Sequence, residues 1–136
     1  MQLNAHVNFN GNCEEAFKFY EQHLGGKIEV LMRYEGTPAM GMSPAGWQNK
    51  VLHGRVAIGG TTLMGADAPP GRYDAPKGMG ISLSVSGEAE AEKIFAALSE
   101  KGTVSMPIQE TFFATRFGMV TDKFGVPWMV VREKTA

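Results

Sequence analysis

Apolar and polar residues alternate at the start of the chain with the two-residue period of a β-strand that buries one face. The apolar positions are Leu3, Ala5, Val7 and Phe9, and the polar positions between them are Asn4, His6, Asn8 and Asn10. One face of this strand is therefore expected to pack under another element, and the opposite face is unusually polar.

A helix is predicted to follow this strand directly. Asn12 stands at the position of an N-terminal cap, and Glu15 three residues later completes the pattern of a capping box. Apolar residues then recur at helical spacing as far as the glycine pair at 25–26, which ends the helix. We expect the Asn12 side chain to accept hydrogen bonds from the first helical N–H groups, and the helix to cover the apolar face of the first strand.

Three further strands are expected in the first half of the chain. Residues 27–34 (KIEVLMRY) form the first of them, and a loop rich in Gly, Pro and Met, without a clear period, follows as far as about residue 49. Residues 50–58 and 61–66 form a hairpin around Gly59-Gly60. The predicted order of elements in this half is therefore βαβββ.

The same order begins again after a loop, DAPPGRYDAPKG, whose Pro and Gly content opposes regular structure. Alternating apolar and serine positions predict a strand from residue 81, and a helix is expected at about residues 88–101. Residues 103–108 and 109–131 supply three more strands. The second half of the chain is thus also predicted to be βαβββ.

The two halves align as an internal repeat. Pairing Asn4 with Gly80 also brings the glycine that ends the first helix onto the glycine that ends the second. We therefore predict an α+β protein with one domain, residues 1–136, made of two βαβββ modules at about residues 1–67 and 78–136. Their helices cover one side of the strands, and the other side is expected to form a curved mixed sheet around a concave cavity, a natural ligand site.

Composition narrows the class of protein. A chain of 136 residues is about one domain, and a hydrophobic content of 43% is ordinary for a globular protein. A net charge of -1 leaves no basic surface for nucleic acid, and no apolar run approaches the length of a membrane span. The single cysteine, Cys13, cannot form an internal disulfide. We expect a cytoplasmic protein that binds neither nucleic acid nor membrane, in which Cys13 is structural.

The closing segment, QETFFATRFGMVTDKFGVPWMVV, combines strand-forming residues with Arg116, a Trp and a tight turn that Asp122 opens and Gly125 closes. Together with the opening LNAHVNFNGNCEEAFKFY and the central IGGTTLMGAD, it resembles the PhnB-like branch of the vicinal-oxygen-chelate superfamily, which includes glyoxalases, bleomycin-resistance proteins and extradiol dioxygenases. The resemblance spans nearly the whole chain and implies the glyoxalase/bleomycin-resistance fold. It departs at Phe113-Ala114, where the family often has Trp-Gly, and we expect this to reshape the pocket rather than the fold.

The resemblance also implies where a divalent metal would bind. Superfamily enzymes hold the metal with four side chains, one near the start of the first strand and one near the end of the last strand of each module. These positions fall here on Asn4, Met64, Gly80 and Met129. A thioether or a glycine does not serve a hard divalent cation, which leaves at most a weak oxygen from Asn4. We therefore expect the usual metal site to be absent and no cofactor to be needed.

Two functions of different classes remain open. The first is a binding protein whose cavity sequesters or carries a small, partly apolar molecule. Its predicted polar anchors are His6, Asn8, Ser82 and Arg116, and its predicted walls are Met64, Phe113, Trp128 and Met129.

The second is a metal-dependent lyase, isomerase or dioxygenase with a displaced metal site. This site would use His6 or His53, the latter with Asp67 or Glu110 as a carboxylate partner. Metal bound to the purified protein would favour the enzyme. For either function we expect a homodimer, because similar folds commonly close an open cup by pairing two chains.

Overall fold

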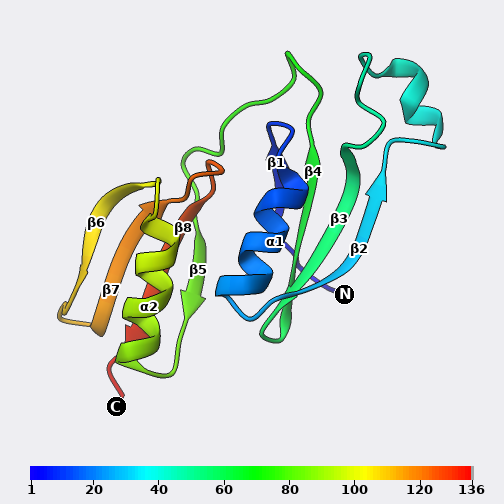
Figure 1. Cartoon of the computed structure of the whole chain (residues 1–136). Helices are drawn as coiled ribbons and strands as arrows, with labels where there is room; N and C mark the ends of the chain where they lie inside the picture. Colours follow the sequence, from blue (N-terminus) through cyan, green and yellow to red (C-terminus); the bar gives the residue numbers. More distant parts are fainter. Residues whose placement is uncertain (136) are drawn as a thin grey trace. The chain divides into compact units, whose positions relative to one another are not determined.

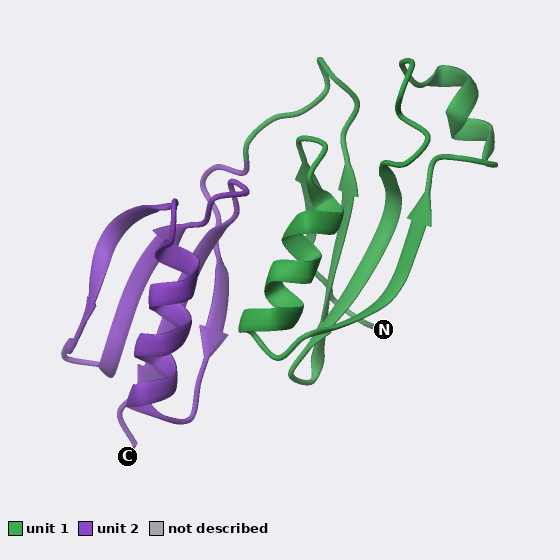
Figure 2. Cartoon of the chain, viewed as in Figure 1, with its two compact units in different colours: residues 1–75 green, residues 76–136 purple. Residues whose placement is uncertain are grey.

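A computed structural model describes residues 1–135 of the chain (Figure 1). The chain divides into two compact units, unit 1 (residues 1–75) and unit 2 (residues 76–136), each with one α-helix and one four-stranded sheet (Figure 2). Both units have the order strand, helix and three strands, which confirms the predicted α+β class and the two βαβββ modules. In the part of the chain that is described, neither α-helix is long and apolar enough to cross a membrane.

Unit 1 has a mixed sheet with the strand order β1-β4-β3-β2. Its elements are β1 (His6–Phe9), α1 (Cys13–His23), β2 (Lys27–Arg33), β3 (Val51–Ile58) and β4 (Thr61–Asp67), with a short 3-10 helix, η1 (Pro38–Met42), between β2 and β3. β1 runs parallel to β4, and the other neighbouring strands pair antiparallel. The first strand of the unit therefore pairs with the last strand of the same unit.

Helix α1 lies across one face of this sheet and buries the apolar residues of β1 (Figure 1). The rings of Phe9 and Phe17 meet edge to face, with their centroids 5.9 Å apart. Two glycines of the sheet make this close approach possible. A Cβ at Gly54 would lie 2.8 Å from Cε2 of Phe17, and a Cβ at Gly65 would lie 2.9 Å from Cε2 of Phe9. The predicted cover of the first strand by the first helix is confirmed.

Unit 2 repeats this arrangement with the strand order β5-β8-β7-β6. Its elements are β5 (Ile81–Ser84), α2 (Glu88–Ser99), β6 (Thr103–Gln109), β7 (Ala114–Thr121) and β8 (Pro127–Glu133). Helix α2 covers one face of the sheet (Figure 1). Its Phe95 packs on Gly118, where an added Cβ would lie 2.5 Å from Cε1 of the ring. Each unit thus uses glycine in the sheet to bring a helix aromatic close to the backbone.

The two units pair their first and last strands in the same register. His6 lies opposite Met64 in the parallel pair of unit 1, and Ser82 lies opposite Met129 in that of unit 2. The alignment that pairs Asn4 with Gly80 also pairs His6 with Ser82. The shared register is what the internal repeat in the sequence predicts.

The turn between β7 and β8 is built as its sequence predicts. Oδ1 of Asp122 accepts hydrogen bonds from the backbone N–H groups of Phe124 and Val126, at 2.9 and 3.0 Å. Gly125 has a φ of 89°, which favours glycine. The second oxygen of Asp122 accepts a hydrogen bond from the indole N–H of Trp128 at 2.8 Å, so this buried carboxylate holds both the turn and the adjacent aromatic residue.

Asn12 directly precedes α1 but does not cap it. Its side chain makes no capping hydrogen bond, and its buried Oδ1 has no hydrogen-bond partner within residues 1–135. The acceptor at the helix start is Asp67 at the end of β4, whose Oδ1 lies 2.9 Å from the backbone N of Cys13. The predicted Asn12 cap is therefore wrong, because a carboxylate from a distant strand accepts the bond, and a charged acceptor near a helix N-terminus is the stronger one.

Candidate functional site

The candidate site is the face of each sheet that its helix leaves uncovered, which we call the free face of that unit. In unit 1, Val7 and Phe9 are buried under α1, whereas the intervening residues of β1 are exposed. Successive strand residues point to opposite faces, so His6 and Asn8 lie on the free face. The polar side of the first strand, noted in the sequence, is thus the side away from the helix.

One row of side chains crosses the free face of unit 1. His6 is opposite Met64, and Met64 is opposite Arg55 of β3. His53 is two residues from Arg55 on the same strand, so it shares the same face, and it lies opposite Met32 of β2. This face therefore carries two imidazoles and a guanidinium around thioether side chains.

Basic groups set the electrostatics of this face. The side chain of His6 remains exposed but is partly desolvated by its neighbours, which lowers its pKa, and the nearby His53 lowers that pKa further. Arg55 is half-buried, and its guanidinium forms no hydrogen bond or ion pair with any residue from 1 to 135. The free face of unit 1 therefore holds an unpaired cation together with an imidazole that is neutral near pH 7.

The free face of unit 2 is less polar. Met119 of β7 lies opposite Met129 of β8, and Met129 lies opposite Ser82 of β5. Phe117 is two residues before Met119 and shares its face, and its ring centroid is 5.1 Å from that of Phe113 in the loop before β7. Thioethers and phenyl rings dominate this face, with a serine hydroxyl at its edge.

A hollow of about 410 Å³ opens beside these methionines. Met79, Met119 and Met129 line it together with the hydroxyl-bearing residues Ser105 and Thr121. None of the residues that line it carries a charge. Its size and lining suit a small and partly apolar molecule.

Two predicted ligand-binding residues lie on the opposite, helix-covered side of unit 2. Arg116 points to α2, where its Nε is 3.2 Å from Oε1 of Glu92 and its Nη2 is 3.6 Å from Oε2 of Glu88. Trp128 is buried and bonded to Asp122, and it also lines the hollow beside Met129. The ion pairs of Arg116 hold its side chain on the helix side, whereas Trp128 keeps a place in the wall of the hollow, and a role of either residue in ligand binding stays a prediction. The remaining predicted residues lie on or beside the free faces: His6, Asn8 and Met64 in unit 1, and Ser82, Phe113 and Met129 in unit 2.

Sequence reasoning missed two residues of the free faces, Arg55 and Phe117. Arg55 follows the predicted candidate His53 by two positions in one strand, and Phe117 precedes Met119 by two positions in another. Strand alternation therefore carried a usable signal for both. That Arg55 lacks a partner is visible only once the neighbouring strands are in place.

The four positions that correspond to the superfamily's metal ligands offer a poor ligand set. Met64 and Met129 are thioethers, and Gly80 has no side chain. The amide of Asn4 donates from Nδ2 to the carbonyl oxygen of Thr62 at 3.0 Å. Within residues 1–135, no group of three or more His, Cys, Asp or Glu side chains is placed to hold a metal ion. The donors at these positions do not fit a hard divalent cation.

The two carboxylates considered as partners of His53 are already engaged. Asp67 is buried, with an exposed fraction of 2%, and its oxygens accept hydrogen bonds from the backbone N–H groups of Cys13 and Val51. Glu110 lies 3.3 Å from the Nζ of Lys134. The hydrogen bonds of Asp67 to the helix start and to Val51 therefore count against its use as a partner of His53.

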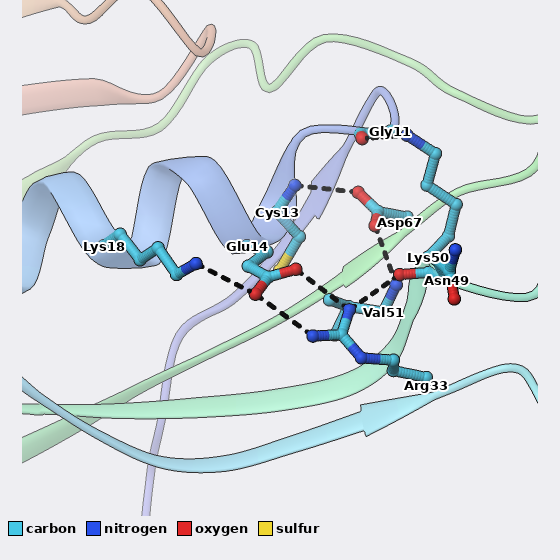
Figure 3. A network of polar contacts seen from close by, with 9 residues as sticks. All are labelled: Gly11, Cys13, Glu14, Lys18, Arg33, Asn49, Lys50, Val51 and Asp67. Carbon is cyan, nitrogen blue, oxygen red and sulfur yellow. Dashed lines mark hydrogen bonds and ion pairs between the residues drawn. The ribbon is translucent and has the colours of Figure 1, made fainter.

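A polar network ties the start of α1 to the sheet of unit 1 (Figure 3). Asp67 accepts from Cys13 at 2.9 Å and from Val51 at 2.8 Å. The carboxylate of Glu14 accepts bidentate hydrogen bonds from the guanidinium of Arg33, at 2.9 and 3.1 Å. Those bonds are the main reason that the pKa of Glu14 falls to about 2. These charged groups satisfy one another, so the network is structural.

Cys13 is held in this network as a neutral thiol. Burial raises its pKa, and the carboxylates of Asp67 and Glu14 raise it further. The thiolate is the nucleophilic form of cysteine, so the position lacks the state that covalent catalysis requires. This supports the structural role expected for Cys13.

The comparisons with known proteins agree over almost the whole chain. Residues 3–130 match the Glyoxalase/Bleomycin resistance protein/Dioxygenase superfamily. Protein YjdN of Escherichia coli (strain K12) is 33% identical over 138 residues, which cover 96% of this chain and 94% of YjdN. The crystal structure of protein PA1353 from Pseudomonas aeruginosa is 46% identical, with a TM-score of 0.89 and 99% of each chain covered.

A more distant solved structure shares the fold. It is a putative 3-demethylubiquinone-9 3-methyltransferase, PhnB protein, from Bacillus cereus, and it is 23% identical to this chain. The TM-score is 0.82, with 97% of this chain and 99% of that chain covered. At this identity the likeness concerns the fold alone.

Proposed function

Because this chain belongs to the glyoxalase/bleomycin resistance protein/dioxygenase superfamily, as its motifs predicted, we propose that it binds a small, partly apolar molecule on the free face of one of its sheets. It sequesters or carries this molecule without the divalent metal that enzymes of the superfamily use. One observation carries the proposal. Two thioethers and a glycine stand at Met64, Met129 and Gly80, where metal ligands are required.

The free faces supply the contacts that such a ligand needs. Met64 in unit 1 and Met129 in unit 2 offer flexible apolar surface that adapts to different shapes. His6 and Ser82, opposite these methionines, offer polar groups that fix orientation. The uncharged hollow in unit 2 has the volume of an ordinary small-molecule site.

The alternative is a metal-dependent lyase, isomerase or dioxygenase with a displaced metal site. One observation favours it: His6 and His53 share the free face of unit 1 and are close enough that His53 lowers the pKa of His6. Imidazole is a common ligand of zinc, iron and nickel. The donor set nevertheless stops at two histidines, because Asp67 is engaged elsewhere.

Metal analysis and a ligand screen test the proposal together. Protein purified without chelator should carry well under one equivalent of Ni, Zn, Mn or Fe per chain, and added metal should leave the melting temperature nearly unchanged. A small molecule that binds should raise the melting temperature, because a ligand at 100 times its Kd adds about 2.7 kcal/mol to the free energy of unfolding. Stoichiometric metal in the parent, lost in His6→Ala or His53→Ala, would overturn the binding function and establish the displaced-site enzyme.

A gain-of-function variant provides the matched control. Replacing Met64 and Met129 with Glu and Gly80 with His supplies three ligands of the kind a glyoxalase-like site uses. This triple variant should acquire metal affinity that the parent lacks, and it should be less stable without metal, since new polar groups enter apolar surroundings. A triple variant that binds metal no better than the parent would show that these positions are not where the superfamily's metal site falls.

A further inference from the structure

Arg55 differs from the other half-buried arginines of this protein. Arg33 is paired with Glu14, Arg116 with Glu88 and Glu92, and Arg132 donates to backbone carbonyl oxygens. The guanidinium of Arg55 has no acceptor within residues 1–135, although the residue is half-buried. A guanidinium carries five N–H donors and no acceptor, so this position lacks the acceptor, anionic or neutral, that the other half-buried arginines have.

The surroundings of Arg55 do not supply that partner. Its cross-strand neighbours are Met64 on β4 and Val30 on β2. Beyond Met64 lies His6, and two residues along β3 lies His53. Glu29, at the bulge of β2 beside Val30, is exposed and makes no ion pair with Arg55. Lys27, farther along β2, is also basic. The local potential is therefore positive.

We infer that Arg55, His6 and His53 form a binding site for an anionic head group, a carboxylate or a phosphoryl group, on the free face of unit 1. This inference rests on the proposed function and gives its ligand a chemical class, a small anion with an apolar body. The guanidinium fork matches two oxygens of such a head group. A neutral imidazole adds one N–H donor. The thioethers of Met32 and Met64, on the same face, provide apolar surface for the body of the ligand.

Three probes that share a phenyl ring test the inference. Benzoate and phenyl phosphate carry the two anionic head groups, and benzamide is a neutral isostere of benzoate. Binding of each probe to the full chain is followed by two-dimensional amide NMR, which locates the site. At least one anion should bind with shifts centred on β1, β3 and β4, and benzamide should bind about tenfold or more weakly, since charge-assisted hydrogen bonds are the stronger class. The preference between benzoate and phenyl phosphate separates carboxylate from phosphoryl recognition.

Matched substitutions assign the effect to Arg55. Arg55→Gln should lower the affinity for the preferred anion about tenfold or more. Arg72→Gln makes the same chemical change at an exposed loop position of unit 1 and should leave the affinity unchanged. Arg55→Lys keeps the charge but loses the forked guanidinium, so its affinity for the anion should lie between those of the parent and Arg55→Gln. His6→Gln and His53→Gln should each weaken binding by a smaller factor. Thermal unfolding of every variant verifies the fold, and Arg55→Lys answers the question if Arg55→Gln does not fold.

Several outcomes would overturn the inference. The inference is wrong if benzamide binds as tightly as the anions, or if no anion binds at millimolar concentration. It is also wrong if Arg55→Gln and Arg55→Lys both bind the preferred anion with the parent's affinity. The proposed function survives these outcomes if the thermal screen finds a neutral ligand on a free face. It fails separately if the protein carries a stoichiometric metal.

Discussion

The carboxylate of Asp67 accepts a hydrogen bond from the backbone N–H of Cys13, 54 residues earlier in the chain, at 2.9 Å. Its other oxygen accepts from the backbone of Val51 at 2.8 Å. One buried side chain at the end of β4 therefore joins the start of α1 to the start of β3. The first helix of unit 1 is positioned by the last strand of its own sheet.

Removing this carboxylate should destabilise the protein strongly. Asp67→Ala leaves two buried N–H groups without acceptors, which should cost about 2–6 kcal/mol of unfolding free energy. Asn12→Ala is the matched control, and it should change the stability by less than about 0.5 kcal/mol, since the Asn12 side chain makes no capping bond. Urea unfolding measures both. A larger loss in Asn12→Ala than in Asp67→Ala would mean that the helix is capped locally after all.

The thiol of Cys13 should be unreactive until the protein unfolds. Its pKa is raised in the folded state, so the folded protein keeps the proton while an unfolded thiol loses it near pH 8.5–9, about its ordinary value. The contribution of Cys13 to stability is thus fully present below that pH and is lost as pH rises above it. Stability should fall with pH more steeply in the parent than in Cys13→Ala. Equal slopes, or rapid labelling of the native thiol by a disulfide reagent, would contradict this.

Gly118 should not tolerate a methyl group. A Cβ there would lie 2.5 Å from the ring of Phe95, so Gly118→Ala should cost about 1–3 kcal/mol or more through displacement of α2. Gly60→Ala makes the same change in a turn where an added Cβ meets nothing within 4 Å, and its effect should stay within about 0.5 kcal/mol. Thermal or urea unfolding compares the two. Equal stabilities would show that the Phe95 ring moves aside without cost.

The chain is expected to form a homodimer. β2 and β6 lie at the edges of their sheets, and an exposed strand edge presents unpaired backbone groups that favour pairing or burial. Exposed Phe112 and Phe113 add apolar surface in unit 2. Sedimentation or light scattering at tens of micromolar should give twice the mass of the chain. A monomer mass at that concentration would reject the expectation.

The order of elements could be predicted because it rests on local patterns. Alternation marks the strands, helical spacing marks α1 and α2, and Asp122 with Gly125 marks a turn in which Asp122 accepts hydrogen bonds from residues two, four and six positions later. Alternation does not mark where a strand ends. It predicts a first strand from Leu3, but β1 begins at His6 and Leu3 is exposed.

Local patterns predict less of the candidate site than of the fold. Trp128 and Met129 are consecutive in β8 and point to opposite faces, and only packing shows that Trp128 is the buried one, although both border the hollow of unit 2. A register shift in β7 between Ala114 and Arg116 decides which residues face α2, and nothing in the sequence marks it. The Asn12 cap failed for the same reason, because its competitor Asp67 is remote in the chain.

Because the first strand of each half pairs with the last strand of the same half, each sheet is complete within one half of the chain. Every strand partner of β1–β4 lies before residue 68, and every partner of β5–β8 lies after residue 80. A circular permutation that cuts the intervening segment would sever no strand pair and would leave each sheet encoded by one uninterrupted stretch. The segment between the units is therefore the place where the chain can be lengthened, shortened or permuted without changing the strand pairing of either sheet.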